Sequence, residues 1–319
     1  MKLTNTGKTI QQIPQAELKL DYQIKKVLSC KPILARILAE VVEECKDMSY
    51  NEIEKSIEGD VLIDRVPIEP GLFNIVGNSQ EDFQVGEGCV RYDIRTYLKL
   101  DKYSEPELAK ILIDVEAQKD EYTGYDLPIR GIFYCSRMIS SQLGQEFSVS
   151  TNDAVKYGNI KKVYSIWICP EVAQKRANCI EKFCINKEML CGNDNDDDRY
   201  DLMSTIIIKL SKKHDTDGAN NTLINMLTDL FNETISAEKK IKILEQKYQL
   251  PITEEVEREV ADMCTYTTYV ENKGREREIF SSVQEGDYSI KRGAEKLGIT
   301  ETEFVKRMEE AGYKVSALI

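Results

Sequence analysis

Apolar residues recur at helical spacing in two parts of the chain. In residues 32–45 one face of a helix carries the apolar side chains of Ile33, Leu34, Ile37, Leu38, Val41, Val42 and Cys45. Pro32 suits the first turn of this helix. Residues 126–142 show a second pattern of this kind. We therefore expect a helix over each range.

Short β-type runs lie between and after these helices. We expect them within residues 60–76, 89–100, 109–118, 161–169, 178–186 and 201–210. The run 161–169 is apolar throughout its centre and is expected to end at Pro170 as a buried strand. The order helix, strands, helix, strand predicts a mixed α/β domain.

The last hundred residues predict helices. Residues 220–272 are highly charged and indicate an accessory bundle. The terminal segment predicts a helix, a tight turn at Gly298 and a second helix, with Thr300 as N-cap and Glu303 completing a capping box. Its charge is nearly balanced, so a hairpin used for packing or oligomerisation fits the pattern as well as one that reads DNA.

Composition and charge limit the classes of protein. Among 319 residues, 41% are hydrophobic and 31% are charged, and no apolar run is long enough to span a bilayer. The N-terminus shows no apolar signal-peptide core. We expect a cytoplasmic protein without a membrane partner. The net charge of −12 means that any DNA-binding surface must be local.

Histidine and cysteine usage exclude further classes. The single histidine, His214, lies in a polar run and cannot supply a histidine metal site, a Ser-His-Asp triad or an HNH nuclease. The nine cysteines are odd in number and include no C-x-x-C pair, so a secreted disulfide framework is not expected. Most lie in apolar stretches and are expected to be small buried side chains.

The residues that suggest chemistry lie on two neighbouring strand candidates. Asp93 and Arg95 would share one face of the first strand, and Glu116 and Gln118 one face of the second. Strands joined by a short turn are usually neighbours, which would bring the two carboxylates about 5 Å apart. Both stay ionised only if a cation lies between them, and hard oxygen ligands suit Mg²⁺ or Mn²⁺. Exposed acids on half-buried strands would explain the same spacing without a function.

Four segments, in this order, resemble one known family. They are GCVRYDI at 88–94, IDVEAQKDEYTGY at 113–125, RGIFYCSRMISSQ at 130–142 and KKVYSIWIC at 161–169. They resemble the PD-(D/E)XK nuclease family transposases of the recombination-promoting nuclease group. The likeness runs from about Asp21 to Pro170 and returns at the terminal hairpin. It implies a restriction-endonuclease-like fold with a mixed sheet flanked by helices, dependence on a divalent metal, and DNA cleavage.

The resemblance also implies a set of site residues. Asp93 matches the motif aspartate and Glu116 the metal-binding acid, so both are expected to hold Mg²⁺. Gln118 stands where the wider superfamily has a lysine, and glutamine can hydrogen-bond the attacking water but cannot supply a positive charge. A nearby cation would then substitute. Arg95, on the predicted face of Asp93, and Arg130, at the start of the next helix, are the candidates.

Two accessory residues complete the predicted site. Glu44 is one heptad past Ile37 and points toward the buried stripe, so it is the candidate acid from the first helix, although a structural hydrogen bond fits this position equally well. Tyr134 follows Arg130 at helical spacing and would line the site or belong to an ordinary polar stripe.

Taken together, the sequence predicts a metal-dependent DNA endonuclease that serves transposition-like recombination or defence. DNA is the expected partner, with a homo-oligomer as a further expectation. The alternative is a catalytically inactive member of the same fold that binds DNA or protein. The predicted parts are an N-terminal arm (1–17), a nuclease-like domain (18–215), a helical accessory region (216–283) and a C-terminal helix-turn-helix-like hairpin (284–319).

Overall fold

A computed structural model describes most of the chain. The described residues are 15–63, 81–84, 88–100, 110–117, 126–142, 157–192, 200–211 and 221–313. Gln118, His214 and the apolar run 72–76 lie outside them. The chain forms two compact units, one from Asp21 to Met263 and one from Cys264 to Ile319 together with Met1–Leu20.

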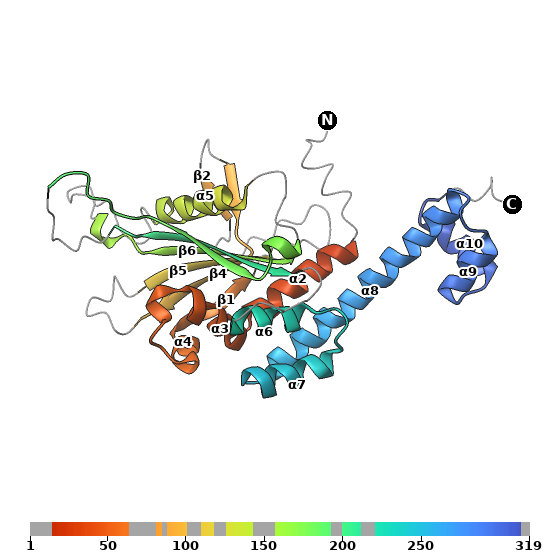
Figure 1. The fold of residues 1–319 in the computed structure, drawn as a ribbon, viewed down its shortest axis with the longest axis horizontal. Helices are drawn as coiled ribbons and strands as arrows, with labels where there is room; N and C mark the ends of the chain where they lie inside the picture. The colour runs from red at the N-terminus through yellow and green to blue at the C-terminus, as the bar shows by residue number, and fades with distance from the viewer. Residues whose placement is uncertain are drawn as a thin grey trace. The chain divides into compact units, whose positions relative to one another are not determined.

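A mixed sheet of six strands forms the centre of the larger unit (Figure 1). Its strands, in spatial order, are β1 (Ile57–Ile63), β4 (Ile94–Lys99), β5 (Lys110–Ala117), β6 (Val163–Val172), β8 (Met203–Ser211) and β7 (Cys179–Cys184). The neighbours β5, β6 and β8 are parallel, while β1, β4 and β7 pair antiparallel. Nearly every residue of β6 and β8 is buried, as expected for parallel strands that are covered on both faces.

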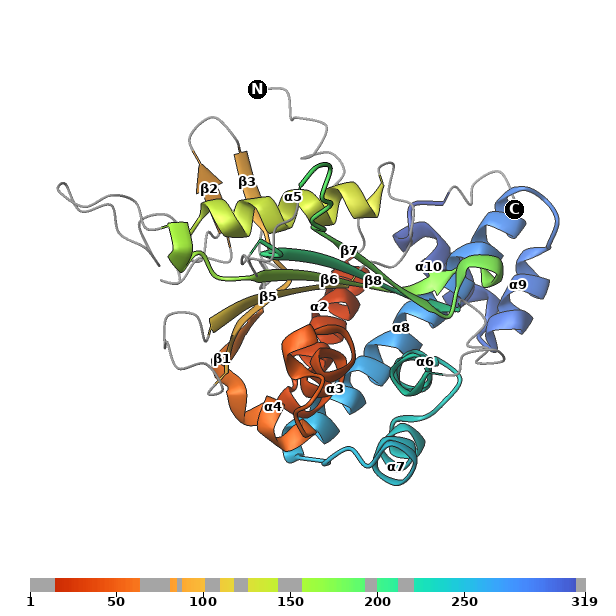
Figure 2. The same ribbon diagram turned by 60° about the vertical axis from the view of Figure 1, so that its left-hand side comes forward.

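Helices cover both faces of this sheet, which confirms the mixed α/β architecture (Figures 1 and 2). Helix α5 (Leu127–Ser140) lies on one face, and the opposite face carries α3 (Lys31–Val41), α4 (Tyr50–Ser56) and α6 (Thr222–Phe231). The described part of the chain also contains α2 (Gln15–Ser29), α7 (Ala237–Tyr248) and α8 (Glu254–Gln284). None of the helices in the described part of the chain has the length and apolarity that a membrane span requires.

The contact between α5 and the sheet is especially close. Trp167 of β6, fully buried, packs in one core with Tyr134 and Met138 of α5. Gly131 faces β8, where a Cβ atom would lie 2.2 Å from Cγ2 of Thr205. Only a residue without a side chain allows this approach, so Gly131 fixes the distance between α5 and the sheet.

Two predicted elements differ from the structure: one helix ends earlier than its apolar pattern, and one strand is divided into two. The first helix ends at Val41 because Val42 is extended, with φ −95° and ψ 117°, and a 3₁₀ turn (η1, Glu43–Cys45) follows. The predicted strand 89–100 is two strands in different sheets. β3 (Gly88–Arg91) pairs with β2 (Glu81–Gln84), and β4 begins only at Ile94.

The predicted end of one strand is also wrong. β6 continues through Pro170 to Val172 instead of ending before the proline. Its register with β8 shifts between Cys169 and Val172, and such an irregularity accommodates a residue that cannot donate to the ladder.

The smaller unit contains the expected helical hairpin. Helix α9 (Ile290–Leu297) ends at Gly298, which has a left-handed conformation with φ 66°. The hydroxyl of Thr300 accepts a hydrogen bond from the N–H of Glu303 and caps α10 (Glu301–Glu310), while the Glu303 carboxylate accepts from Arg307. Phe304 packs edge-to-face on Phe280 of α8 with a centroid distance of 5.0 Å, and these rings form the centre of a small apolar core.

Candidate functional site

Asp93 and Glu116 lie side by side where β4 begins and β5 ends. The backbone N–H of Asp93 donates to Oε1 of Glu116 at 2.9 Å, and the N–H of Ala117 donates to Oδ2 of Asp93 at 3.2 Å. Because the strands are antiparallel, with Ile94 opposite Val115, the residue before β4 meets the last residues of β5. Each acid is therefore held by a backbone donor from the other strand.

The face of the sheet that carries Glu116 follows from the strand register. Glu116 is level with Trp167 on the parallel neighbour β6, and Trp167 packs under α5. The Tyr134 ring lies 5.3 Å from Trp167 and 5.5 Å from Tyr92. Tyr92 precedes Asp93, so one aromatic cluster fixes both strand segments from which the two acids emerge.

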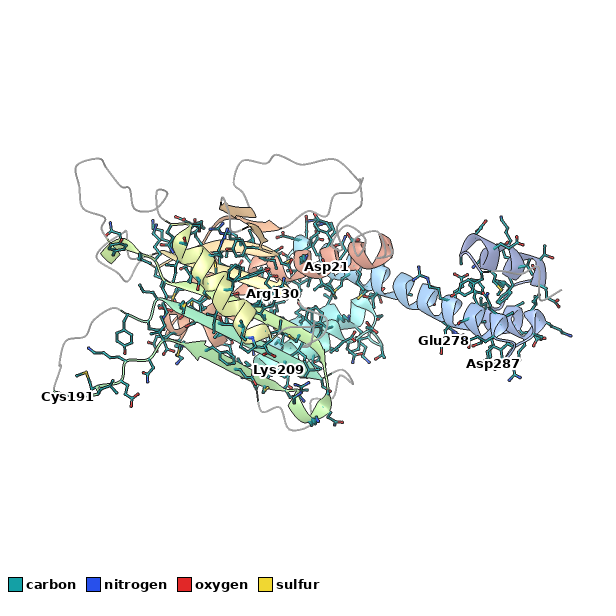
Figure 3. All side chains as sticks on the ribbon, turned by 90° about the horizontal axis from the view of Figure 1, so that it is seen from above. Asp21, Arg130, Cys191, Lys209, Glu278 and Asp287 are labelled. Atoms are coloured by element: carbon teal, nitrogen blue, oxygen red, sulfur yellow. The ribbon has the colours of Figure 1, made fainter. Side chains whose placement is uncertain are left out.

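Lys25 of α2 joins this pair of acids. Its ammonium nitrogen Nζ is 2.7 Å from Oδ1 of Asp93 and 2.7 Å from Oδ2 of Asp21. The Lys25 side chain is 8% exposed and that of Asp93 17% exposed. Figure 3 labels Asp21 on α2. The cluster thus contains three carboxylates, of Asp21, Asp93 and Glu116, and the ammonium of Lys25.

Burial and charge act on these groups in opposite directions. Burial raises the pKa of Asp93 above its ordinary value, and the charge of Lys25 opposes this change. Burial by itself would lower the pKa of Lys25, but the charges of Asp93 and Asp21 raise it above its ordinary value. We conclude that Lys25 carries a fixed positive charge at neutral pH.

Only a partial signal for Lys25 can be found along the chain. Asp21 and Lys25 have the i, i+4 spacing of an ion pair on a helix, which is common on solvated surfaces. Nothing along the chain connects that helix with Asp93. The two arginines predicted to supply the missing positive charge have other contacts. The Arg95 guanidinium lies 5.2 Å over the ring of Tyr92.

Arg130 and Tyr134 lie against the aromatic cluster. Arg130 donates to the hydroxyl oxygen of Tyr134 at 2.9 Å, and its guanidinium lies 4.9 Å over the ring of Trp167. Since Trp167 is the strand neighbour of Glu116, Arg130 is on the same face of the sheet as that acid.

Glu44 belongs to a different polar cluster. It lies in η1 beyond the end of α3, so the heptad argument for its direction does not apply. Its Oε2 accepts from the hydroxyl of Tyr164 at 2.7 Å, and its Oε1 is 3.3 Å from Nζ of Lys162. Tyr164 alternates with Val163 and Ser165 along β6 and therefore points to the face opposite α5. Glu44 therefore makes a structural hydrogen bond and lies outside the candidate site.

A cavity opens on the α5 face of the sheet. Its volume is about 300 Å³, and its lining residues are Asp126, Leu127, Pro128, Ile129, Arg176, Ile207 and Lys209. Glu116 of β5 is level with Trp167 of β6, and Trp167 is level with Ile207 of β8. The part of the cavity at Ile207 is therefore two strand spacings, or roughly 10 Å, from Glu116. Lys209 is ion-paired with Glu181 at 3.0 Å. The cavity therefore adds two basic side chains to the face that carries Glu116.

The donor set of Asp93 and Glu116 fits a hard divalent cation. Within the described ranges, no group of three or more His, Cys, Asp or Glu side chains is arranged to hold a metal ion. Mg²⁺ in phosphate chemistry is commonly bound by only one or two protein carboxylates, with water and substrate oxygens completing its shell. Asp93 and Glu116 provide that number.

No protein-family model, no curated protein and no solved structure matches this chain. A functional proposal therefore depends on the geometry of Asp93, Glu116 and Lys25.

Proposed function

We propose that this chain is a metal-dependent nuclease of the PD-(D/E)XK type that hydrolyses phosphodiester bonds in DNA. The observation that carries the proposal is a pair of hydrogen bonds between the start of β4 and the end of β5, in which the N–H of Asp93 donates to Glu116 and the N–H of Ala117 donates to Asp93. Two buried carboxylates held beside each other by backbone donors are stable as a pair of anions only with a cation present. The mixed sheet flanked by helices is consistent with the restriction-endonuclease-like fold that the proposal includes.

The proposed reaction is the hydrolysis of a phosphodiester bond. The oxygen of a water molecule forms a bond to phosphorus while the bond from phosphorus to one sugar oxygen breaks. One water proton ends on the released sugar hydroxyl, and the other stays with the new phosphate group. Asp93 and Glu116 would hold Mg²⁺ or Mn²⁺, and Gln118 would position the water. When bound, the ion supplies positive charge and acidifies a water molecule.

DNA is the proposed substrate because basic groups accompany the acids on one face. The chain as a whole is acidic, with a net charge of −12, so the DNA backbone must be bound by a local group of basic side chains. Arg176 and Lys209 line the cavity, which adjoins β8, two strands away from Glu116 on β5. Arg130 lies over Trp167 of β6, the strand between them. These side chains would contact phosphates next to the bond that is cut. A role in recombination or transposition follows from the sequence resemblance.

One observation favours a second candidate function. The ammonium of Lys25 already neutralises part of the charge of Asp93, and Glu116 is only 4% exposed. A site that is complete without a metal would belong to a catalytically inactive protein that uses the same fold to bind DNA or another protein.

Plasmid nicking separates these two functions. The full chain is incubated with supercoiled plasmid in Mg²⁺, in Mn²⁺ and in EDTA, and the conversion to open circles is followed. We expect nicking in either metal and none in EDTA. Asp93→Asn keeps the shape of the side chain but removes a metal-binding charge, so its rate should fall at least roughly 100-fold, as when one charge-stabilising group is removed.

Asp201→Asn is the matched control. Asp201 is also ion-paired with a lysine, at 2.9 Å from Lys162, but belongs to the cluster of Glu44. This variant should nick at the wild-type rate. If both variants nick equally well, the proposed site is wrong. If the wild type shifts DNA at low salt without nicking in either metal, the non-catalytic function is supported instead.

A further inference from the structure

We propose that Lys25 is the site's own cation, which competes with the divalent ion for Asp93 and supplies positive charge to the phosphate during hydrolysis. This inference rests on the proposed nuclease function and assigns a further residue to the same site. It identifies a contribution from α2, an element on which no candidate site residue was expected.

The contacts of Lys25 carry the inference. Its ammonium is 2.7 Å from Oδ1 of Asp93, while Oδ2 of the same carboxylate accepts from the N–H of Ala117 at 3.2 Å. A metal ion bound by Asp93 would coordinate Oδ1, so the ammonium and the metal ion compete for the same oxygen atom. Asp21 holds the ammonium from the other side at 2.7 Å. Lys25 is thereby kept beside Asp93 but also has a second partner to which it can remain bound.

The charges explain both parts of the proposed role. The site contains three carboxyl groups, those of Asp21, Asp93 and Glu116, and one ammonium, that of Lys25. Removing the ammonium makes the site more negative, which strengthens the attraction for a divalent cation. The same change strengthens the repulsion of a phosphodiester, whose own charge is negative and grows during attack. Metal binding and hydrolysis should therefore respond to the loss of Lys25 in opposite directions.

Lys26 provides a matched control on the same helix. Its Nζ is 2.7 Å from Oε2 of Glu259, an acid of α8 with a side chain that is 3% exposed. Replacing Lys25 removes one positive charge and its ion pairs with Asp93 and Asp21, and replacing Lys26 removes one positive charge and its ion pair with the buried Glu259. Only Lys25 contacts an acid of the candidate site. An effect that comes from lost stability alone should appear in both variants.

Titration calorimetry with Mn²⁺ and no DNA tests the competition. We expect Lys25→Met to bind Mn²⁺ at least about tenfold more tightly than the wild type, because a unit charge has been removed within a few ångströms of the ion. Lys26→Met should bind Mn²⁺ as the wild type does. Lys25→Arg keeps the charge and should return the affinity to near the wild-type value. Binding by Lys25→Met that is unchanged or weaker overturns the competition.

Nicking at saturating Mn²⁺ tests the second part of the proposal. There kcat of Lys25→Met should fall roughly 100-fold, since one group that stabilises transition-state charge is lost. Lys25→Arg should recover most of that loss, and Lys26→Met should keep the wild-type kcat. A wild-type kcat in Lys25→Met overturns the assigned role in hydrolysis.

A further variant keeps the test decisive if Lys25→Met does not fold. Asp21→Asn leaves Lys25 and Asp93 in place but removes one negative charge and the second partner of the ammonium. Mn²⁺ should then bind several-fold more weakly, and equal or tighter binding overturns the inference. If the wild type binds Mn²⁺ but never nicks DNA, the nuclease function fails while the calorimetric comparison still decides the competition. If no variant binds Mn²⁺, both proposals are overturned.

Discussion

The groups around a buried ionisable side chain decide whether it is charged and what it can do. Lys25 remains charged because two carboxylates surround it. Cys30 is the opposite case, since its thiol is buried with a relative exposure of 1%. Burial, with smaller contributions from Glu255 and Glu259, raises the pKa of Cys30 to about 12, although Lys26 and Arg258 oppose the change.

This shift predicts the reactivity of Cys30. At pH 8 the thiolate needed for alkylation is nearly absent, so iodoacetamide should label Cys30 only after unfolding. The exposed Cys184 and Cys191 serve as internal controls and should react in the folded protein. Mass spectrometry of labelled peptides checks this. Labelling of Cys30 at the rate of Cys184 would show that the thiol is accessible.

The same shift has a consequence for stability at high pH. The unfolded thiol has its ordinary pKa of 9.0, and the folded thiol a value of about 12. Between these values the unfolded chain has lost a proton that the folded chain keeps, so the equilibrium moves toward unfolding. The contribution of Cys30 to stability is therefore complete below about pH 9 and declines as the pH rises toward 12.

At the scale of elements, the position of α5 determines the geometry of the candidate site. Tyr134 of α5 contacts both Tyr92 and Trp167, which adjoin Asp93 and Glu116 in sequence or in register. The depth at which α5 lies depends on Gly131. A shift of this helix would move the aromatic cluster and, with it, the strand segments that carry the two acids.

Gly131→Ala should therefore lower both stability and activity. The added methyl group would overlap Cγ2 of Thr205 and approach Nε1 of Trp167 to 3.0 Å, so helix and sheet must separate. Overpacking of this kind typically costs about 1–3 kcal/mol of unfolding free energy, which urea denaturation measures. Gly158→Ala, where a new Cβ would meet nothing within 4 Å, is the control. Equal stability of the two variants would show that the contact is not tight.

At the scale of the whole molecule, the two units have separate apolar cores. The larger unit contains Trp167, the only tryptophan in the chain. The smaller unit has its own core around Phe280, Phe304 and Met308. Tryptophan fluorescence therefore reports on the larger unit alone, while helical circular dichroism reports on both.

Phe304→Ala should unfold the two units at different temperatures. Truncating a buried phenylalanine costs about 3–5 kcal/mol, which is most of the stability that a unit of this small size can have. We expect an early loss of helical dichroism and an unchanged midpoint of the Trp167 fluorescence transition. Glu309→Ala, at an exposed position, should change neither signal. A parallel shift of both transitions would show that the units unfold as one.

Local periodicity predicted most elements well. The helix expected over 126–142 is α5 (Leu127–Ser140), and the strand expected over 109–118 is β5 (Lys110–Ala117). Element ends were less predictable where a single backbone angle decides them. Val42 and the residues before Ile94 leave the regular pattern although their side chains are compatible with it.

Local sequence patterns were sufficient to predict the α/β class, the order of the elements and the pairing of the segments that carry Asp93 and Glu116. These follow from apolar spacing and short connections, which act within one element or between neighbours. The ion pair of Lys25 with Asp93 and the hydrogen bond of Glu44 with Tyr164 became visible only in the folded chain. Such contacts join distant parts of the chain. They depend on where a helix packs against the sheet, and no local pattern encodes that position.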